Sequence, residues 1–388
     1  MAAPITEREV SLGPTGTPSE RFTSRDPEAF EVPRGREESW RFTPTRALRE
    51  LFEPFAPTTR IAGSVEAPDG VSWSIVQPSD ERVGRVIQPA DRVSALAFAH
   101  APQAFVLEID AGRELTEPVL VHGVAEPGLA YEHMVIEAKP NSRATVVVDY
   151  TGAGTIAENV EIIVGEGAQL TFVSLQDWAE DAIHLGAHAI QVGRDATLKH
   201  VVVNLGGKIV RLCPTVTFDG PGGRADLLGV SFAGSGQHFE SRLYLDHSVP
   251  NCTSDVMYKN ALLGETARTV WIGDVRIRPA AKATSTYEMN RNLLLSDGAR
   301  ADSVPNLEIE TGEIVGAGHA STTGRFDDLQ LFYLQSRGIE HDEAQRLVVR
   351  GFFADVVGRI GVDDLEHRIM TAIETRLGFA PSTELESA

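Results

Sequence analysis

The chain has 388 residues, of which 42% are hydrophobic, and its 55 acidic and 35 basic residues give a formal net charge of −20 at pH 7. This length allows two or three domains and a large core. The acidic balance argues against a surface for nucleic acids or anionic membranes, because phosphate contacts need clustered cations. We therefore expect proteins, small molecules or metals as partners.

Two cysteines, Cys213 and Cys252, are too few for a disulfide framework and are not spaced as a Cys-x-x-Cys pair. The first residues show no basic segment followed by an apolar core, and no run of about 18 apolar residues follows. These features predict a cytoplasmic protein that has no evident export signal and no membrane span.

Residues 1–100 are predicted to form an N-terminal arm and a helical region. A short helix is expected near residues 26–30, in a segment rich in Pro, Gly, Ser and charge. A second helix is expected to be capped by Thr43 and to start at Pro44, with apolar residues at helical spacing that face the next domain or another subunit: Leu48, Leu51, Phe52 and Phe55. A strand near 71–76 and a helix near 92–99 complete this region.

Residues 101–324 carry short aliphatic runs between turns, for example at 105–107, 146–148 and 201–203. The turns at 164–170 and 192–198 share one plan of glycine and alanine, and those at 139–146 and 220–227 are looser versions of it. Alanines recur in these turns at similar but unequal intervals, at Ala144, Ala168, Ala196 and Ala225. Such a quasi-period without long helices predicts a mainly β fold with a β-solenoid core. A β-sandwich is the alternative, because the period drifts.

The stretch 287–322 joins this core to the tail. Leu293 to Leu295 predict a buried strand that ends at a turn containing Gly298. Leu307 and Ile309 alternate with acidic residues and predict a strand with one dry face. Residues 316–320 are interpreted as a glycine-rich turn that leaves the imidazole of His319 uncrowded.

Residues 325–388 are predicted to be a C-terminal helical domain with three helices. The first starts at Asp327 and Asp328, carries an apolar stripe and stops at Arg337-Gly338; the second covers about 344–356; the third covers about 365–377 and ends at Gly378.

Few residues suggest chemistry directly. His319 is a candidate metal ligand or proton carrier, although a lone histidine in a turn is more often structural. His184 and His188 are spaced for a metal pair but lack a third ligand. Cys213 and Cys252 are interpreted as core residues. No phosphate-binding loop, nucleophile elbow or dinucleotide fingerprint is present. The polar run 290–292 is expected to form stacks along a solenoid face or to meet a partner.

Four segments, 39–44, 252–259, 290–300 and 331–339, resemble the SufB/SufD family of iron–sulfur cluster assembly proteins, and the Trp-Arg-x-Thr-Pro segment is similar to the SufD branch. The resemblance implies a right-handed parallel β-helix between helical regions. It also implies a cytoplasmic, non-enzymatic scaffold of the SUF system, whose β-helix pairs with a SufB-like subunit. A SufC-like ATPase would dock on the C-terminal helices, with Phe332, Tyr333, Arg337 and Phe352 as partner-binding residues.

The resemblance also matches His319 to the family histidine in a Cys-Ser-His-Gly-Ala-Thr segment. It implies that His319 is a metal ligand for an iron–sulfur cluster shared with SufB, and that this chain alone holds no cofactor stably. The family cysteine two residues earlier is Ala317 here, so no thiolate is available at that position. A homodimer is possible when the partner is absent. The alternatives from other classes are a β-helix enzyme acting on carbohydrate or acyl groups and a structural homo-oligomer.

Overall fold

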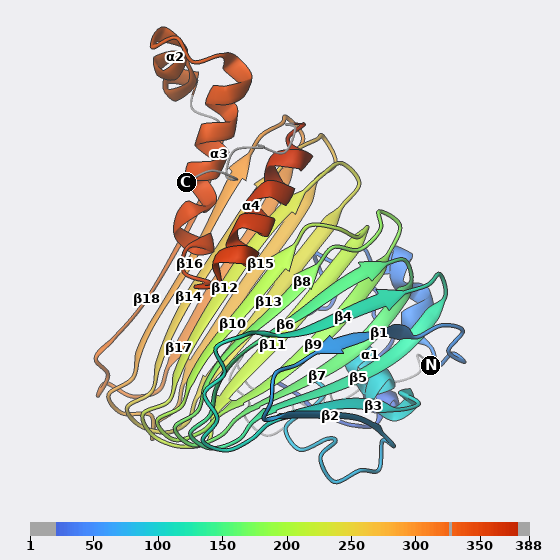
Figure 1. The fold of residues 1–388 in the computed structure, drawn as a ribbon. Helices are drawn as coiled ribbons and strands as arrows, with labels where there is room; N and C mark the ends of the chain where they lie inside the picture. The colour runs from blue at the N-terminus through green and yellow to red at the C-terminus, as the bar shows by residue number, and fades with distance from the viewer. Residues whose placement is uncertain (1–20, 326–327, 379–388) are drawn as a thin grey trace, which may run out of the picture.

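The computed structural model describes residues 21–325 and 328–378, and the strands in these residues form two nine-stranded sheets that face each other (Figure 1). The first sheet contains β1 (Ile61–Glu66), β4 (Val119–Ala125), β6 (Arg143–Gly152), β8 (Gln169–Gln176), β10 (Thr197–Asn204), β12 (Arg224–Ala233), β14 (Thr253–Leu262), β16 (Ser285–Leu294) and β18 (Gly316–Arg325), in that order. The second contains β2 (Val71–Val76), β3 (Ala104–Ile109), β5 (Leu129–Ala138), β7 (Thr155–Val164), β9 (Ile183–Val192), β11 (Ile209–Phe218), β13 (His238–His247), β15 (Arg268–Ile277) and β17 (Arg300–Ile309).

From β3 onward the chain alternates between the two sheets, and neighbouring strands within each sheet run parallel. Each pair of successive strands is therefore one coil of a β-helix. The register pairs Arg143↔Gln169 and Thr253↔Ser285 show that the later coils are longer than the earlier ones. The predicted β-solenoid is confirmed, and the β-sandwich alternative is wrong because its sheets would be antiparallel. At the N-terminal end, β1 and β2 pair antiparallel with β4 and β3.

A turn residue in the left-handed conformation explains why the coils repeat. It stands two residues before each strand of the first sheet from β6 to β16, and glycine, asparagine and aspartate, which tolerate positive φ, fill five of the six positions. The six residues are Asn141, Gly167, Asp195, Gly222, Asn251 and Ala283, with φ between 52° and 80°.

The alanine alignment predicted from sequence is partly wrong. Ala168 and Ala196 are equivalent, since each directly precedes a strand start, but Ala144 and Ala225 pair in register with Leu170 and Leu198 instead. The repeated feature is the positive-φ turn residue, and the alanines only accompany it.

Aliphatic and aromatic side chains from the inner faces of both sheets fill the β-helix. A column of side chains with polar groups also points inward from the first sheet. Its members occupy the same register position in successive coils: Tyr150, Gln176, Asn204, Ser231, Asn260, Asn292 and Thr323. Asn260 and Asn292 share a hydrogen bond of 2.8 Å, and the amide of Asn292 also donates to Thr323 at 3.1 Å. The polar stacks expected around 290–292 therefore exist inside the solenoid, because Asn290 and Asn292 point inward.

The N-terminal segment packs on the outer face of the second sheet, as predicted for its apolar face (Figure 1). It contains η1 (Pro27–Ala29), η2 (Thr45–Phe52) and α1 (Arg92–His100). Trp40 is buried there beneath the guanidinium of Arg211, which lies 4.0 Å from the centre of the Trp40 ring. The predicted cap at Thr43 is wrong, because its hydroxyl donates to the buried carboxylate of Glu240 at 2.7 Å. The helix is a 3-10 helix that begins at Thr45 and ends before Phe55.

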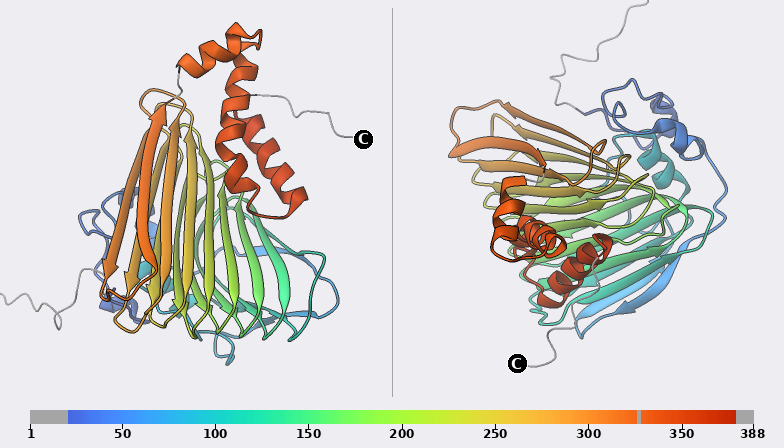
Figure 2. Two further views of the ribbon diagram at one scale, coloured as in Figure 1. Left: turned by 90° about the vertical axis from the view of Figure 1, so that its left-hand side faces the viewer. Right: turned by 90° about the horizontal axis from the view of Figure 1, so that it is seen from above.

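In the described part of the tail, three helices follow the last strand, as predicted: α2 (Asp328–Ser336), α3 (His341–Val357) and α4 (Asp363–Arg376). Figure 2 shows α3 and α4 lying against the outer face of the first sheet, while α2 projects beyond it. The residues Phe326 and Asp327, at the predicted start of the first helix, lie outside the described residues. Within residues 21–325 and 328–378, no helix is both long and apolar enough to cross a membrane.

Two expectations for the stretch 287–322 need correction. Residues 316–320 are the first half of strand β18 and not a turn. The face of β17 expected to be dry is largely open, since Ile309 is exposed and Leu307 only partly buried. Both differences arise because β17 and β18 form the final coil, and no further coil covers it in the described part of the chain. The strand around Leu293 is confirmed, and it ends in a turn with Gly298 at a φ of 82°.

Candidate functional site

The last coil of the β-helix leaves two strand edges without a partner. β17 pairs only with β15, and β18 pairs only with β16, within the part of the chain that the structure describes. An unpaired strand edge is a template for adding a strand from another chain. Apolar side chains stand exposed beside these edges, including Val315, which is 74% exposed, and Ile309 and Tyr287. The open end therefore has the backbone groups and the apolar surface that a docking site for a β-protein needs.

His319 lies on β18 at this open end, and its side chain is exposed. Its register partner on β16 is Glu288. Since residues in register on parallel strands share a face, His319 points to the same side as Glu288, which is the side of the solenoid interior. The imidazole thus lies over the end of the core, where a partner that covered this coil would meet it. Ala317, two residues earlier, shares that inward face.

Buried polar atoms without hydrogen-bond partners gather in the two coils below His319. Within the described residues, neither carboxylate oxygen of Glu288 has a partner, and the same is true of the Trp271 indole nitrogen and the Tyr258 hydroxyl. A β-carbon at Gly273 would clash with Glu288 Oε1, so glycine at that position makes room for the carboxyl group. Burial, with a smaller effect of Asp274, raises the pKa of Glu288 to about 8. The core below the open end therefore holds a carboxyl group that is mostly protonated at neutral pH.

The helical tail is fixed to the first sheet by an apolar contact and by ion pairs. Val349, Phe353 and Ile369 are fully buried against the outer face of the sheet. Three arginines of the tail each pair with an acidic residue of the β-helix, at 2.6 to 2.7 Å: Arg359 with Asp255, Arg368 with Asp149, and Arg376 with Asp177. These contacts make α3 and α4 a fixed part of the β-helix surface.

Helix α2 packs on α3 and carries exposed aromatic side chains. Phe332 is 69% exposed and Tyr333 57% exposed, and the guanidinium carbon of Arg337 lies 5.0 Å from the centre of the Tyr333 ring. Phe352, the fourth residue predicted to bind a partner, is in a different place. It is partly buried on α3, where it packs against the apolar cluster on the first sheet and lies under the ammonium group of Lys259. The structure thus brings Phe332, Tyr333 and Arg337 together, apart from Phe352.

The histidine pair considered as a metal site does not form one. His184 and His188 both point inward from β9, but four residues of strand separate them by about 13 Å. The His184 ring instead bonds to Gln176 and Glu158, and the His188 ring bonds to His200 at 2.9 Å. No group of three or more potential metal-ligating side chains exists in residues 21–325 and 328–378.

The two cysteines differ in their surroundings. Cys252 is fully buried in the core of the β-helix, as expected, and burial raises the pKa of its thiol. The expectation that Cys213 also lies in the core is wrong, because Cys213 points away from the interior of the β-helix and is only partly buried. Neither thiol lies on β16, β17 or β18, so no cysteine of this chain accompanies His319.

Glu288 and the inward polar column are not evident from the sequence alone. A signal for both exists in the alternation of β16, where Thr286, Glu288, Asn290 and Asn292 are all polar and all buried. A strand that alternates in this way is usually interpreted as having its polar side in water. Only the coil-to-coil register shows that the polar side faces inward.

Comparison with known proteins identifies relatives over nearly the whole chain. A family model described as the SufBD core domain of SUF system FeS cluster assembly matches residues 121–352. The chain is 51% identical over 374 residues to the iron-sulfur cluster assembly SufBD family protein Mb1497 of Mycobacterium bovis, and the match covers 94% of each chain. It is 48% identical over 375 residues to the SufBD family protein ML0594 of Mycobacterium leprae, covering 94% of this chain and 96% of that protein.

A more distant similarity connects the chain to a longer protein. It is 29% identical over 255 residues to the SufBD family protein Mb1496 of Mycobacterium bovis, covering 65% of this chain but only 29% of that protein. This match therefore concerns one part of the longer protein.

Proposed function

Because the chain belongs to the SufBD family of iron–sulfur cluster assembly proteins, we propose that it is a non-catalytic scaffold subunit of the SUF system that pairs with a SufB-like subunit through the open end of its β-helix. The observation that carries this proposal is the pair of unpaired edges on β17 and β18, with His319 exposed on β18. A SufB-like partner with a related β-helix would also have unpaired strand edges at its last coil. Edge pairing between the two would bury the exposed apolar side chains at this end.

His319 is proposed to be one ligand of the iron–sulfur cluster during its assembly or transfer. The imidazole is exposed on the face that a partner would cover, and no other potential ligand set surrounds it in the described residues. This chain would therefore supply a single nitrogen, and the thiolates would come from the SufB-like partner. Replacing thiolate ligands by imidazole raises the reduction potential of a cluster.

The direct test is reconstitution of the complex with His319→Ala under anaerobic conditions, with cluster yield and transfer to an acceptor protein as readouts. We expect a clear loss of both. His319→Cys should recover cluster yield, because a thiolate can replace the nitrogen as a ligand. Thr322→Ala, on the opposite face of the same strand, is the matched control and should behave as the parent. Unchanged yield and transfer in His319→Ala would contradict the ligand role.

The tail is proposed to dock a SufC-like ATPase. Phe332 and Tyr333 present apolar surface on the projecting helix α2, and Arg337 adds a cation beside them. Aromatic residues and arginine are among the side chains most enriched at binding hot spots. Phe352 is proposed to act from α3, by holding the tail in place on the sheet.

Pull-down of the ATPase by variants tests this part separately. Phe332→Ala and Arg337→Glu should each reduce capture, whereas Arg46→Glu, a charge reversal on the N-terminal segment, should not. Equal capture by all three variants would contradict docking on α2. Membership of the SufBD family favours the assembly role over the β-helix enzyme and the structural homo-oligomer considered above. Co-purification of the chain without either partner would favour the homo-oligomer.

A further inference from the structure

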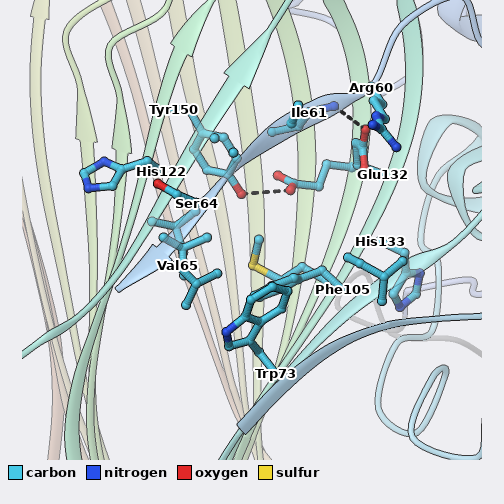
Figure 3. A pocket seen from close by; sticks show the side chains of 18 of the residues that line it. Arg60, Ile61, Ser64, Val65, Trp73, Phe105, His122, Glu132, His133 and Tyr150 are labelled. Carbon is cyan, nitrogen blue, oxygen red and sulfur yellow. Dashed lines mark hydrogen bonds between the residues drawn. The ribbon is translucent and has the colours of Figure 1, made fainter. Parts of the chain in front are cut away.

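A cavity of about 280 Å³ lies at the N-terminal end of the β-helix (Figure 3). His319, on β18, belongs to the last coil at the opposite end. It is bounded by the two antiparallel strands, β1 and β2, and by the inner faces of the first coils. Trp73 and Ile75 of β2 contribute to its lining and are 51% and 50% exposed, so they stand where the cavity meets solvent. The solenoid interior is therefore accessible from this end.

The walls of the cavity are mainly apolar. Ile61 and Val65 come from β1, Phe105 from β3 and Met134 from β5. The ring centres of Trp73 and Phe105 lie 6.1 Å apart with their planes inclined by 27°, and the two rings form an aromatic surface beside the opening. Such walls suit an aliphatic or aromatic body of small size.

Two carboxyl groups interrupt these walls. Glu132 on β5 and Glu158 on β7 are register partners in adjacent coils, so both point inward side by side. Glu158 is almost fully buried; one of its oxygens accepts a hydrogen bond from the Tyr150 hydroxyl at 2.8 Å, and the other bonds to the His184 ring at 3.1 Å. Glu132 accepts a hydrogen bond from the main-chain nitrogen of Ile61 at 2.6 Å.

The charge of this pair is only partly balanced. Arg60 is the one arginine or lysine among the described residues that line the cavity. Burial raises the pKa of Glu132 to about 7, and Glu158 contributes to the rise. The raised pKa means that the surroundings of Glu132 disfavour a negative charge beside Glu158. A positive charge bound nearby would therefore be favourable.

We propose that this cavity is a binding site for a small organic ammonium ion, whose charged group pairs with Glu132 and whose apolar body lies between Ile61, Phe105 and Trp73. The two carboxyl groups would repel an anion. A wholly apolar molecule would displace the water around them without offering hydrogen bonds in its place, which is unfavourable. The donor set does not suit a metal ion, since both oxygens of Glu158 are already hydrogen-bonded and no cluster of three ligating side chains exists among the described residues.

An ammonium group satisfies the main features of the cavity. It donates to a carboxylate in a charge-assisted hydrogen bond, which is stronger than a neutral one. The apolar body gains from contact with the rings of Trp73 and Phe105, which line the cavity. The cavity volume limits the ligand to a small molecule, and the site is independent of the proposed pairing at the other end.

Calorimetric titration of the full chain with 2-phenylethylammonium as the probe tests the proposal. One binding site is expected. Its affinity for the ammonium should rise between pH 6 and pH 8, because Glu132 ionises in this range. The other titratable or charged groups that line the cavity are Glu158, Arg60, His122 and His133. The neutral probe 2-phenylethanol, which has the same shape, should bind more weakly by about tenfold or more, because it lacks the charge. Equal affinity for the two probes, or no binding of the ammonium, would overturn the proposal.

Variants locate the site. Glu132→Gln should weaken binding of the ammonium by about tenfold or more. Trp73→Ala should weaken the binding of both probes, and because Trp73 is half exposed this variant is expected to fold even if Glu132→Gln does not. The matched control is Glu81→Gln, an exposed carboxyl group outside the cavity, which should bind as the parent does. Parent-like affinity in Glu132→Gln, or in Trp73→Ala if the first variant does not fold, would refute the assignment.

Discussion

The ammonium group of Lys259, on β14, donates a hydrogen bond to the main-chain carbonyl oxygen of Phe352, on α3, with 2.6 Å between Nζ and the oxygen. Lys259 is almost fully buried, and its ammonium group also pairs with Asp355, about one turn further along the same helix. Lys259 is thus one of the contacts that connect the first sheet of the β-helix to the tail that carries α2, beside the apolar contact and the three arginine ion pairs. This contact therefore helps to fix the position of the proposed docking surface.

Lys259→Met keeps the length and the apolar stem of the side chain but removes the ammonium group. The variant should lose about 1–3 kcal/mol of stability, because the carbonyl oxygen of Phe352 and the Asp355 carboxylate lose a charged partner. Hydrogen exchange should become faster in α3 and α4 and stay unchanged in β5, β7 and β9, which belong to the other sheet. Lys282→Met, which breaks an exposed pair with Glu313, is the control and should change stability by less than about 1 kcal/mol. Unaltered exchange in α3 would show that Lys259 does not hold the tail.

Phe353→Ala and Phe332→Ala separate anchoring of the tail from docking. Phe353 is fully buried between α3 and the first sheet, so its truncation should cost about 3–5 kcal/mol in a denaturant titration. Phe332 is exposed on α2, so its truncation should leave stability within about 0.5 kcal/mol of the parent. A comparable loss in both variants would mean that α2 is packed against the β-helix in solution.

The β-helix could be predicted from sequence because its repeat depends on local features. Short aliphatic runs mark the strands, and glycine, asparagine or aspartate at five of the six positive-φ turn positions marks the coil boundaries, as at Asn141, Gly167 and Asp195. The last coil could not be predicted in the same way. β18 is rich in glycine and small residues and lacks the aliphatic pattern, because no further coil of the described chain packs against it.

The candidate site was predictable only in part. His319 is identifiable through its resemblance to a family motif, since nothing local distinguishes a lone histidine between small residues. Its neighbour Glu288 belongs to the preceding coil and meets it only through strand register. Glu132 and Glu158 come together across adjacent coils in the same way. The drifting length of the coils prevents such pairings from being derived by counting residues.

Gly229→Ala tests how closely the interior is packed. A β-carbon at Gly229 would overlap the ring of Tyr258, which fills the space beside β12. The ring is buried and cannot move aside easily, so the variant should lose about 1–3 kcal/mol or more. Gly324→Ala is the control, because a β-carbon there meets no atom within 4 Å. If Gly229→Ala melted at the parent's temperature, Tyr258 would have to have another available rotamer in the folded protein.

Acidification should destabilise the protein through its buried histidines. Burial lowers the pKa of His188 to about 4, from an ordinary value of 6.5, and lowers that of His200 as well. The unfolded chain therefore binds protons below pH 6.5 that the folded chain does not bind until about pH 4. His188 alone should reduce the free energy of unfolding by about 1.4 kcal/mol for each pH unit across this window, and its contribution is fully present above the ordinary pKa.

His188→Gln separates this effect from general acid sensitivity. At pH 7.5 the variant should be less stable than the parent by about 1–3 kcal/mol, because glutamine does not reproduce the ring contacts of His188 with Phe172 and His200 in the core. Between pH 6.5 and pH 5, however, it should lose less stability than the parent does, since one buried titrating group has been removed. Urea titrations at pH 5, 6 and 7.5 measure both effects, with the exposed His367→Gln as the control. If the parent and His188→Gln lost stability in parallel on acidification, protonation of His188 would not drive the loss, and carboxyl groups elsewhere in the chain would have to explain it.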